Sequence, residues 1–142
     1  FGMLDAIETA GRIAPPLLDA IVPLFFRPDV NLDDPVPTAF RDALANLPAD
    51  RLRQSIAPLG RLIFGRPDTL ATLADLDAAR TLLMGGAGDM ARPPSETVKM
   101  ASVIGCAHAL VPDAGHISNL ENPAFVTRTL LDWFDAQSLP SN

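Results

Sequence analysis

Residues 80–123 decide the fold of this chain, and they read RTLLMGGAGDMARPPSETVKMASVIGCAHALVPDAGHISNLENP. Thr81–Met84 is a short apolar run that ends in glycines, which is typical of a strand buried on both faces. A helix with Ser95 as its N-cap is expected next, and it ends at Gly105. Residues 106–112 form a second apolar run. The order strand, loop, helix, strand predicts two parallel strands joined by a right-handed crossover.

One acid and one base follow these predicted strands. Asp89 lies in the glycine-rich loop after the first strand, and His116 lies in the loop after the second. Parallel strands end at the same edge of a sheet, where open α/β sheets place their sites. Strands about 5 Å apart would bring the two side chains within hydrogen-bonding distance. The carboxylate would then fix the tautomer of the imidazole and stabilise its protonated form.

Plainer interpretations of both residues stay open at this point. An aspartate in such a loop can simply cap a turn, and His116 can be a polar loop residue. The glycines near Asp89 do not form a G-x-G-x-x-G motif, and no lysine of the Walker type follows them. A phosphate-binding loop is therefore not expected.

The chain before residue 76 predicts short helices separated by prolines, with no alternation typical of a strand. The expected segments are 3–11, 17–26, 38–45 with Thr38 as cap, 49–56, 59–64 after an interruption at Pro58, and 69–76 with Asp68 as cap. Such a set favours a helical cap or lid over residues 1–75, with a small independent helical domain as the alternative. Residues 76–142 then form the second region. Its final helix is predicted from Pro123 to Phe134 with Asn122 as cap, followed by a tail over 138–142.

Composition excludes several classes of function. The chain has 142 residues, 48% of them hydrophobic, and a net charge of −6 with its basic residues dispersed, so we expect no nucleic-acid partner. A single cysteine, Cys106, allows no intrachain disulfide, and two histidines do not make a metal site. The apolar run of residues 13–26 is broken by prolines and too short to span a membrane. A signal peptide is not expected either, and we predict a cytoplasmic protein without metal or cofactor.

Two motifs carry a resemblance to a known family. The first is G-x-x-D-x-x-x-P (Gly86, Asp89, Pro93), and the second, after a strand, is P-x-A-G-H-x-x-x-L-E-x-P over residues 112–123. In this order they resemble the carboxyl-terminal part of an α/β-hydrolase, most similar to the small esterases, lactonases and haloperoxidase-like members. The resemblance covers about residues 70–134. It implies an α/β fold: cap helices plus the last two parallel strands and helices of the hydrolase sheet, incomplete without an amino-terminal partner segment.

The resemblance also implies roles. Asp89 would be the acid and His116 the base of a Ser-His-Asp triad, and the helices before them would form the cap between the sixth and seventh strands. The family's G-x-S-x-G nucleophile elbow and its oxyanion loop lie upstream of the cap, and this sequence contains neither. We therefore expect the chain alone to be inactive. Its expected partner is an amino-terminal segment that carries the serine, or a second copy. Cys106 is not expected to replace the serine, because it begins a strand at the opposite edge.

Four further residues are candidates for substrate contact. Met90 and Ile117 follow the acid and the base, and Phe25 and Phe26 belong to the predicted cap. Each can instead pack in the core. The implied function is a serine hydrolase that cleaves an ester, lactone or related bond of a small acyl substrate. Two alternatives remain: an acyltransferase on the same fold, and a non-catalytic binding module that retains the acid and base as relics.

Overall fold

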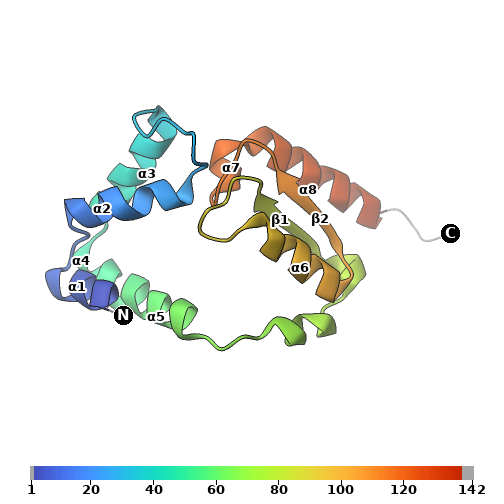
Figure 1. The fold of residues 1–142 in the computed structure, drawn as a ribbon, viewed down its shortest axis with the longest axis horizontal. Coiled ribbons are helices and arrows are strands. Elements are labelled where there is room, and N and C mark those ends of the chain that lie inside the picture. Colours follow the sequence, from blue (N-terminus) through green and yellow to red (C-terminus); the bar gives the residue numbers. More distant parts are fainter. Residues whose placement is uncertain (1, 139–142) are drawn as a thin grey trace. The chain divides into compact units, whose positions relative to one another are not determined.

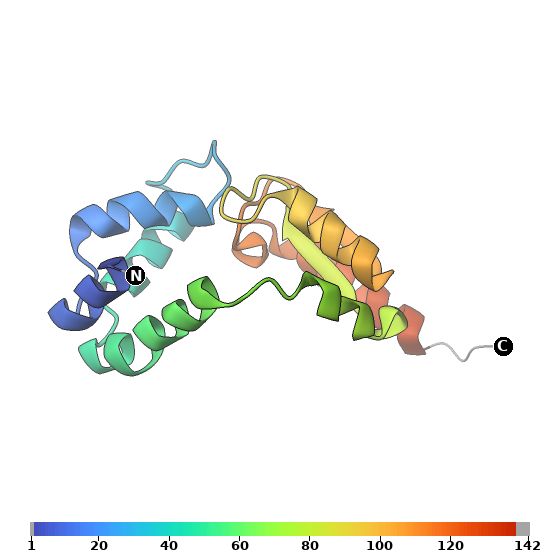
Figure 2. The ribbon, with the colours of Figure 1, turned by 60° about the horizontal axis from the view of Figure 1, so that its bottom comes forward.

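The computed structural model describes residues 2–138, so Phe1 and residues 139–142, most of the predicted tail, lie outside it (Figure 1, Figure 2). The described chain divides into two compact units. The first comprises Phe1–Val22 and Asn31–Asp68, and the second comprises Pro23–Val30 and Thr69–Asn142. Whether the first unit is the cap of a larger enzyme stays a prediction.

Helices are the only regular secondary structure in the described residues of the first unit. Its elements are α1 (Gly2–Ala10), α2 (Pro15–Ile21), the start of the 3₁₀ turn η1 (Val22–Phe25), α3 (Pro35–Ala45), α4 (Ala49–Arg51), the π-helical turn η2 (Leu52–Ile56) and α5 (Ala57–Gly65). The core consists of apolar side chains from these elements and the turn after α1: Leu4, Ile7, Ile13, Leu18, Val22, Leu52 and Ala57. Arg61 on α5 pairs with Asp5 and Glu8 on α1, and these two carboxylates raise the pKa of its guanidinium.

Three local predictions in this half are wrong. The helix α3 begins at Pro35 after Asp34, and not at Thr38. Proline is tolerated there because backbone N–H groups in the first turn of a helix have no partner within the helix. Pro58 does not separate two helices, because it lies in the first turn of α5. The π-helical turn before it is wider than an α-helical turn and accommodates a residue that lacks a backbone N–H. Asp68 is not a helix cap, since the next 3₁₀ helix begins after Thr69.

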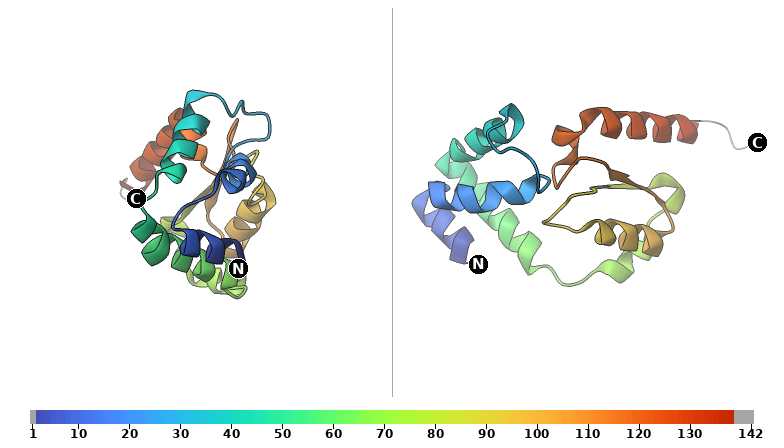
Figure 3. Two further views of the ribbon diagram at one scale, coloured as in Figure 1. Left: turned by 90° about the vertical axis from the view of Figure 1, so that its left-hand side faces the viewer. Right: turned by 45° about the horizontal axis from the view of Figure 1, so that its top comes forward.

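The second unit is a mixed α/β structure. Its elements after η1 are η3 (Leu70–Asp75), η4 (Ala78–Arg80), β1 (Leu82–Gly86), α6 (Pro94–Ile104), β2 (Ala107–Val111), α7 (Ser118–Glu121) and α8 (Pro123–Ser138). The strands are parallel and in register from Leu82 opposite Ala107 to Gly86 opposite Val111. The helices α6 and α8 lie on opposite sides of this strand pair (Figure 3). The predicted pair of parallel strands with a helix between them is confirmed.

Signals at the ends of elements were predicted with mixed success. Gly105 ends α6 in the left-handed conformation (φ 77°), as expected. The side-chain oxygen of Asn122 accepts a hydrogen bond from the Phe125 N–H at 3.1 Å, so the predicted cap of α8 is confirmed. The N-cap of α6 is Pro93 and not Ser95, and α8 continues four residues past Phe134 to Ser138.

Burial of the strands differs from the prediction. Residues 82–85 of β1 are only half-buried, and Ala107, His108 and Leu110 of β2 are exposed. The prediction of a strand buried on both faces is therefore wrong for the chain as described. In a sheet of two strands each strand has only one neighbouring strand, so much of its surface stays exposed. The buried apolar side chains of this unit are Phe26, Ala101, Ile104, Val111 and Ala114. Among the described residues, no helix is both long and apolar enough to cross a membrane.

Candidate active site

Asp89 lies in the loop that follows β1, and its carboxylate is held in place by three hydrogen bonds. Oδ1 accepts from the backbone N–H groups of Ala91 at 2.9 Å and Arg92 at 2.8 Å. These bonds form the local turn that aspartate favours. The side chain is 7% exposed, so the carboxylate is almost fully removed from water and depends on these partners.

His116 is the third partner of this carboxylate. Its Nδ1 lies 2.9 Å from Oδ2 of Asp89, and its side chain is 36% exposed. A carboxylate only accepts hydrogen bonds, so Nδ1–H is the donor. In the neutral ring the other nitrogen, Nε2, then carries a lone pair. Among residues 2–138, Nε2 has no hydrogen-bond partner. The predicted contact between the acid and the base is present.

Backbone contacts between the two loops explain why the side chains meet. The N–H of Ala87 donates to the carbonyl of Val111, and the N–H of Gly88 donates to the carbonyl of Ala114. The pairing of the strands thus continues past their ends. At Gly86 a Cβ atom would lie 2.0 Å from the carbonyl oxygen of Gly115, so only glycine allows this approach.

A segment distant in sequence completes the site. The N–H of Ile117 donates to the carbonyl of Phe25 at 3.2 Å, and the Phe25 ring contacts the His116 ring edge-on, with 5.6 Å between centroids. A Cβ atom on Gly115 would lie 2.4 Å from the backbone carbon of Phe26. The imidazole therefore contacts both the Asp89 carboxylate and the Phe25 ring.

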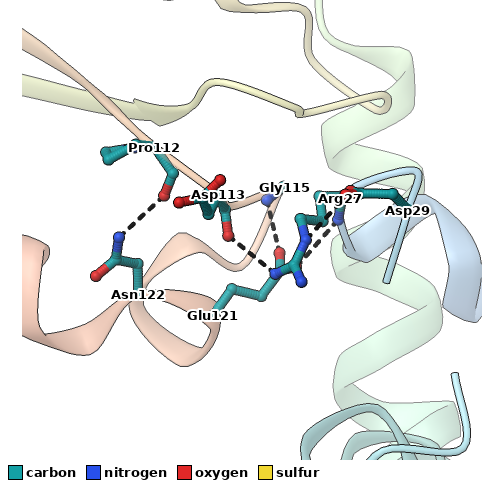
Figure 4. A network of polar contacts seen from close by, with 7 residues as sticks. All are labelled: Arg27, Asp29, Pro112, Asp113, Gly115, Glu121 and Asn122. Carbon is teal, nitrogen blue, oxygen red and sulfur yellow. Dashed lines mark hydrogen bonds and ion pairs between the residues drawn. The ribbon is translucent and has the colours of Figure 1, made fainter. Parts of the chain in front are cut away.

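Glu121 and Arg27 join this segment to the histidine loop (Figure 4). The Glu121 side chain is 3% exposed, and its carboxylate accepts from the backbone N–H of Arg27 at 3.1 Å and of Gly115 at 2.6 Å. The Arg27 guanidinium donates to the carbonyl of Asp113 and lies 3.7 Å from Glu121. In addition, the side chain of Asn122 donates to the carbonyl of Pro112 at the start of the same loop.

The sequence did not predict this network. Glu121 belongs to the second motif, but the resemblance implies no role for it, and Arg27 lies outside both motifs. The only available signal was the acid five residues after His116. Its partner lies 94 residues away in sequence, which is beyond the reach of any local pattern.

The four predicted substrate-contact residues differ in accessibility. Met90 is 59% exposed, and Ile117 is half-buried beside the imidazole. Phe25 is half-buried and touches the His116 ring. Phe26 has no exposed surface, so in this structure it packs in the core and offers nothing to a substrate.

Other reactive groups lie apart from this pair. Cys106 is half-buried and precedes β2, at the opposite end of the strand from His116. Among the described residues, no group of three or more His, Cys, Asp and Glu side chains is arranged to hold a metal ion.

The arrangement of Asp89 and His116 can perform general acid–base chemistry. A buried carboxylate orients the imidazole through Nδ1, and Nε2 can take up a proton from a group placed beside it. This capacity is a matter of geometry, and it leaves the reaction open. Comparisons with protein-family models, with curated proteins and with solved structures gave no match to this chain.

Proposed function

We propose that this chain is the carboxyl-terminal portion of a serine hydrolase of the α/β type, with Asp89 as the acid and His116 as the base of its triad. The observation that carries the proposal is the 2.9 Å hydrogen bond from His116 Nδ1 to a carboxylate that is 7% exposed. Both residues follow parallel strands that end at one edge, which is where such sheets place their sites.

The chemistry follows from the tautomer that this bond selects. Nε2 of His116 accepts the proton of a serine hydroxyl as the serine oxygen bonds to the acyl carbon of an ester or lactone. The imidazolium then returns that proton to the departing alkoxide, which leaves as the alcohol. Water attacks the acyl-enzyme in the same way and releases the carboxylic acid. Asp89 stabilises the imidazolium in both halves without taking up a proton.

In this proposal the serine and the oxyanion hole come from an upstream amino-terminal segment. The half-buried strands support this view, because further strands and their helices would cover them. Three residues are the candidates for contact with the acyl group. Met90 follows Asp89 and Ile117 follows His116 in the sequence, and the Phe25 ring contacts the His116 ring. A cytoplasmic location stays a prediction.

A fluorophosphonate probe tests the proposal on the complete reading frame that contains this chain. The probe should label one serine outside residues 1–142. His116→Ala should slow labelling about 10⁴-fold or more, because removal of the base abolishes activation of the serine. His108→Ala is the matched control: this histidine lies exposed on β2 and should leave labelling unchanged. Labelling that survives His116→Ala at the wild-type rate would contradict the assignment of the base.

The same material separates the alternatives. Mass analysis under denaturing conditions shows whether a second polypeptide accompanies the 15.1 kDa chain; hydrolase activity from the 15.1 kDa species alone would refute the two-piece arrangement. An alcohol that competes with water for the acyl group would indicate an acyltransferase. A complete protein that binds esters but has no reactive serine would be a binding module.

A further inference from the structure

Glu121 is a buried carboxylate to which the proposed reaction gives no direct task. Its side chain is 3% exposed, less than that of Asp89. A carboxylate is costly to remove from water unless it is paired and hydrogen-bonded. Both oxygens of Glu121 meet that condition, since one accepts from the N–H of Arg27 and the other from the N–H of Gly115.

The chemistry of a carboxylate suits this position. Two backbone N–H donors converge on one side chain, and each bonds to a different oxygen: Arg27 to Oε1 and Gly115 to Oε2 of Glu121. A carboxylate has an acceptor at both of these positions, whereas an amide has an acceptor at only one. Glutamine has one acceptor oxygen and would turn its NH₂ group toward one of the donors. The Arg27 guanidinium, 3.7 Å from the carboxylate, adds a favourable charge and is itself anchored on the carbonyl of Asp113.

One donor belongs to the loop that carries the imidazole, and the other belongs to the segment that packs against it. Gly115 immediately precedes His116, so its N–H fixes the backbone from which the imidazole extends. Arg27 lies two residues after Phe25, whose ring contacts the imidazole and whose carbonyl accepts from Ile117. Glu121 therefore clamps together the backbone that carries the imidazole and the segment that packs against it (Figure 4).

We infer that Glu121 is a positioning residue for His116. It acts through Gly115 and through the Phe25–Arg27 segment, and it holds the imidazole where Nδ1 meets Asp89 and Nε2 faces the reacting group. The catalytic consequence of this inference depends on the proposed function. Its structural content, the orientation of one imidazole, can be measured whether or not the protein is a hydrolase.

The test compares Glu121→Gln with Glu96→Gln in the complete protein. The two substitutions make the same chemical change, but Glu96 is a surface residue paired with Arg92 four positions earlier. Long-range ¹H–¹⁵N spectra of ¹⁵N-histidine-labelled protein report which ring nitrogen of His116 carries the proton. Glu121→Gln should lower the ratio of the Nδ1–H to the Nε2–H tautomer about tenfold, and weaken the nuclear Overhauser contact between the Phe25 and His116 rings. Glu96→Gln should change neither.

Catalysis supplies a second readout. For a displaced base, kcat should fall about 10²-fold with KM nearly unchanged, because positioning matters in the transition state more than in substrate binding. Ile104→Val controls for general loss of stability, since it trims a buried side chain on α6 away from this loop. It should lower the unfolding midpoint without altering the His116 tautomer.

The outcomes are distinct. A Glu121→Gln protein that loses stability but keeps the wild-type tautomer and ring contact would overturn the inference and leave Glu121 a purely structural residue. If Glu121→Gln does not fold, Arg27→Met removes only the guanidinium and keeps the backbone donor. It should shift the tautomer in the same direction by a smaller factor, and an unchanged tautomer there would also overturn the inference. Absence of hydrolase activity in the wild type would contradict the proposed function alone, since the spectra still report positioning.

Discussion

The substitution Asp89→Asn separates the two tasks of one side chain. Oδ1 of Asp89 holds the turn by accepting from Ala91 and Arg92, and Oδ2 accepts from His116. Asparagine keeps an oxygen for the two backbone donors and places its NH₂ group opposite Nδ1. Two donors cannot pair, so the neutral imidazole must move its proton to Nε2 and accept at Nδ1. The turn should survive and the tautomer should invert.

The magnitudes follow from the bonds. A hydrogen bond to a charged partner contributes about 1.5–3 kcal/mol, which corresponds to a tautomer ratio of roughly 10 to 160 in favour of Nδ1–H. Asp89→Asn should cost about 1–2 kcal/mol of stability, because one charge-assisted bond becomes a neutral one. Asp89→Ala should cost on the order of 3–5 kcal/mol, because it also leaves two half-buried N–H groups unpaired. If the protein is a triad hydrolase, kcat in Asp89→Asn should fall about 10⁴-fold.

The assay is the long-range ¹H–¹⁵N spectrum of histidine-labelled protein at alkaline pH, where imidazoles are neutral. This chain contains two histidines, and exposed His108 on β2 is an internal reference. Asp113→Asn is the matched control. It makes the same change in an exposed residue of the histidine loop, and its backbone φ of 52° suits asparagine.

One result would refute the reasoning. If His116 shows the Nε2–H tautomer in the wild type, or if Asp89→Asn leaves its pattern unchanged, Oδ2 of Asp89 does not orient the imidazole. The assignment of Asp89 as the triad acid would then fail even if the protein proved to be a hydrolase. A similar shift in Asp113→Asn would indicate a general effect of charge on the loop and would contradict the argument equally.

Two further predictions concern stability and are checked by denaturant titration. Gly115→Ala should destabilise the protein by about 3 kcal/mol or more, because its Cβ would lie 2.4 Å from the Phe26 backbone; Gly2→Ala, with open space around it, should be neutral, and equal effects would contradict the predicted clash. Asn122→Ala should cost about 1–2 kcal/mol, because the side chain caps α8 and also donates to the Pro112 carbonyl; an unchanged midpoint would show that water replaces both bonds.

Much of the second unit could be predicted because its signals are local. Two apolar runs indicated β1 and β2, the first of them ending in glycines. Gly105 and Asn122 marked helix ends by their own conformational and hydrogen-bonding preferences. In the first unit the prolines were misleading. Pro35 and Pro58 both lie inside first turns of helices, where a missing N–H costs nothing, but the prediction treated them as breaks.

The contact between Asp89 and His116 could also be predicted, because the topology of parallel strands brings the two loops to one edge. The remainder of the site could not. The segment Phe25–Arg27 packs on the histidine loop through backbone hydrogen bonds and an ion pair between the half-buried Arg27 and the buried Glu121. Backbone atoms carry no sequence signature, and no local pattern connects Arg27 with Glu121 across 94 positions.

Asp89 can cap a turn and orient an imidazole at the same time. Oδ1 caps the turn, and Oδ2 bonds to the imidazole. Because two backbone donors already fix Oδ1, the second oxygen cannot rotate away from His116 without breaking them. The turn thus makes the carboxylate rigid, which a catalytic acid requires. Asparagine would serve the turn nearly as well, so the chemistry at Oδ2 is where the two residues differ. Substituting one for the other therefore tests the proposed catalytic role of Asp89 separately from its role in the turn.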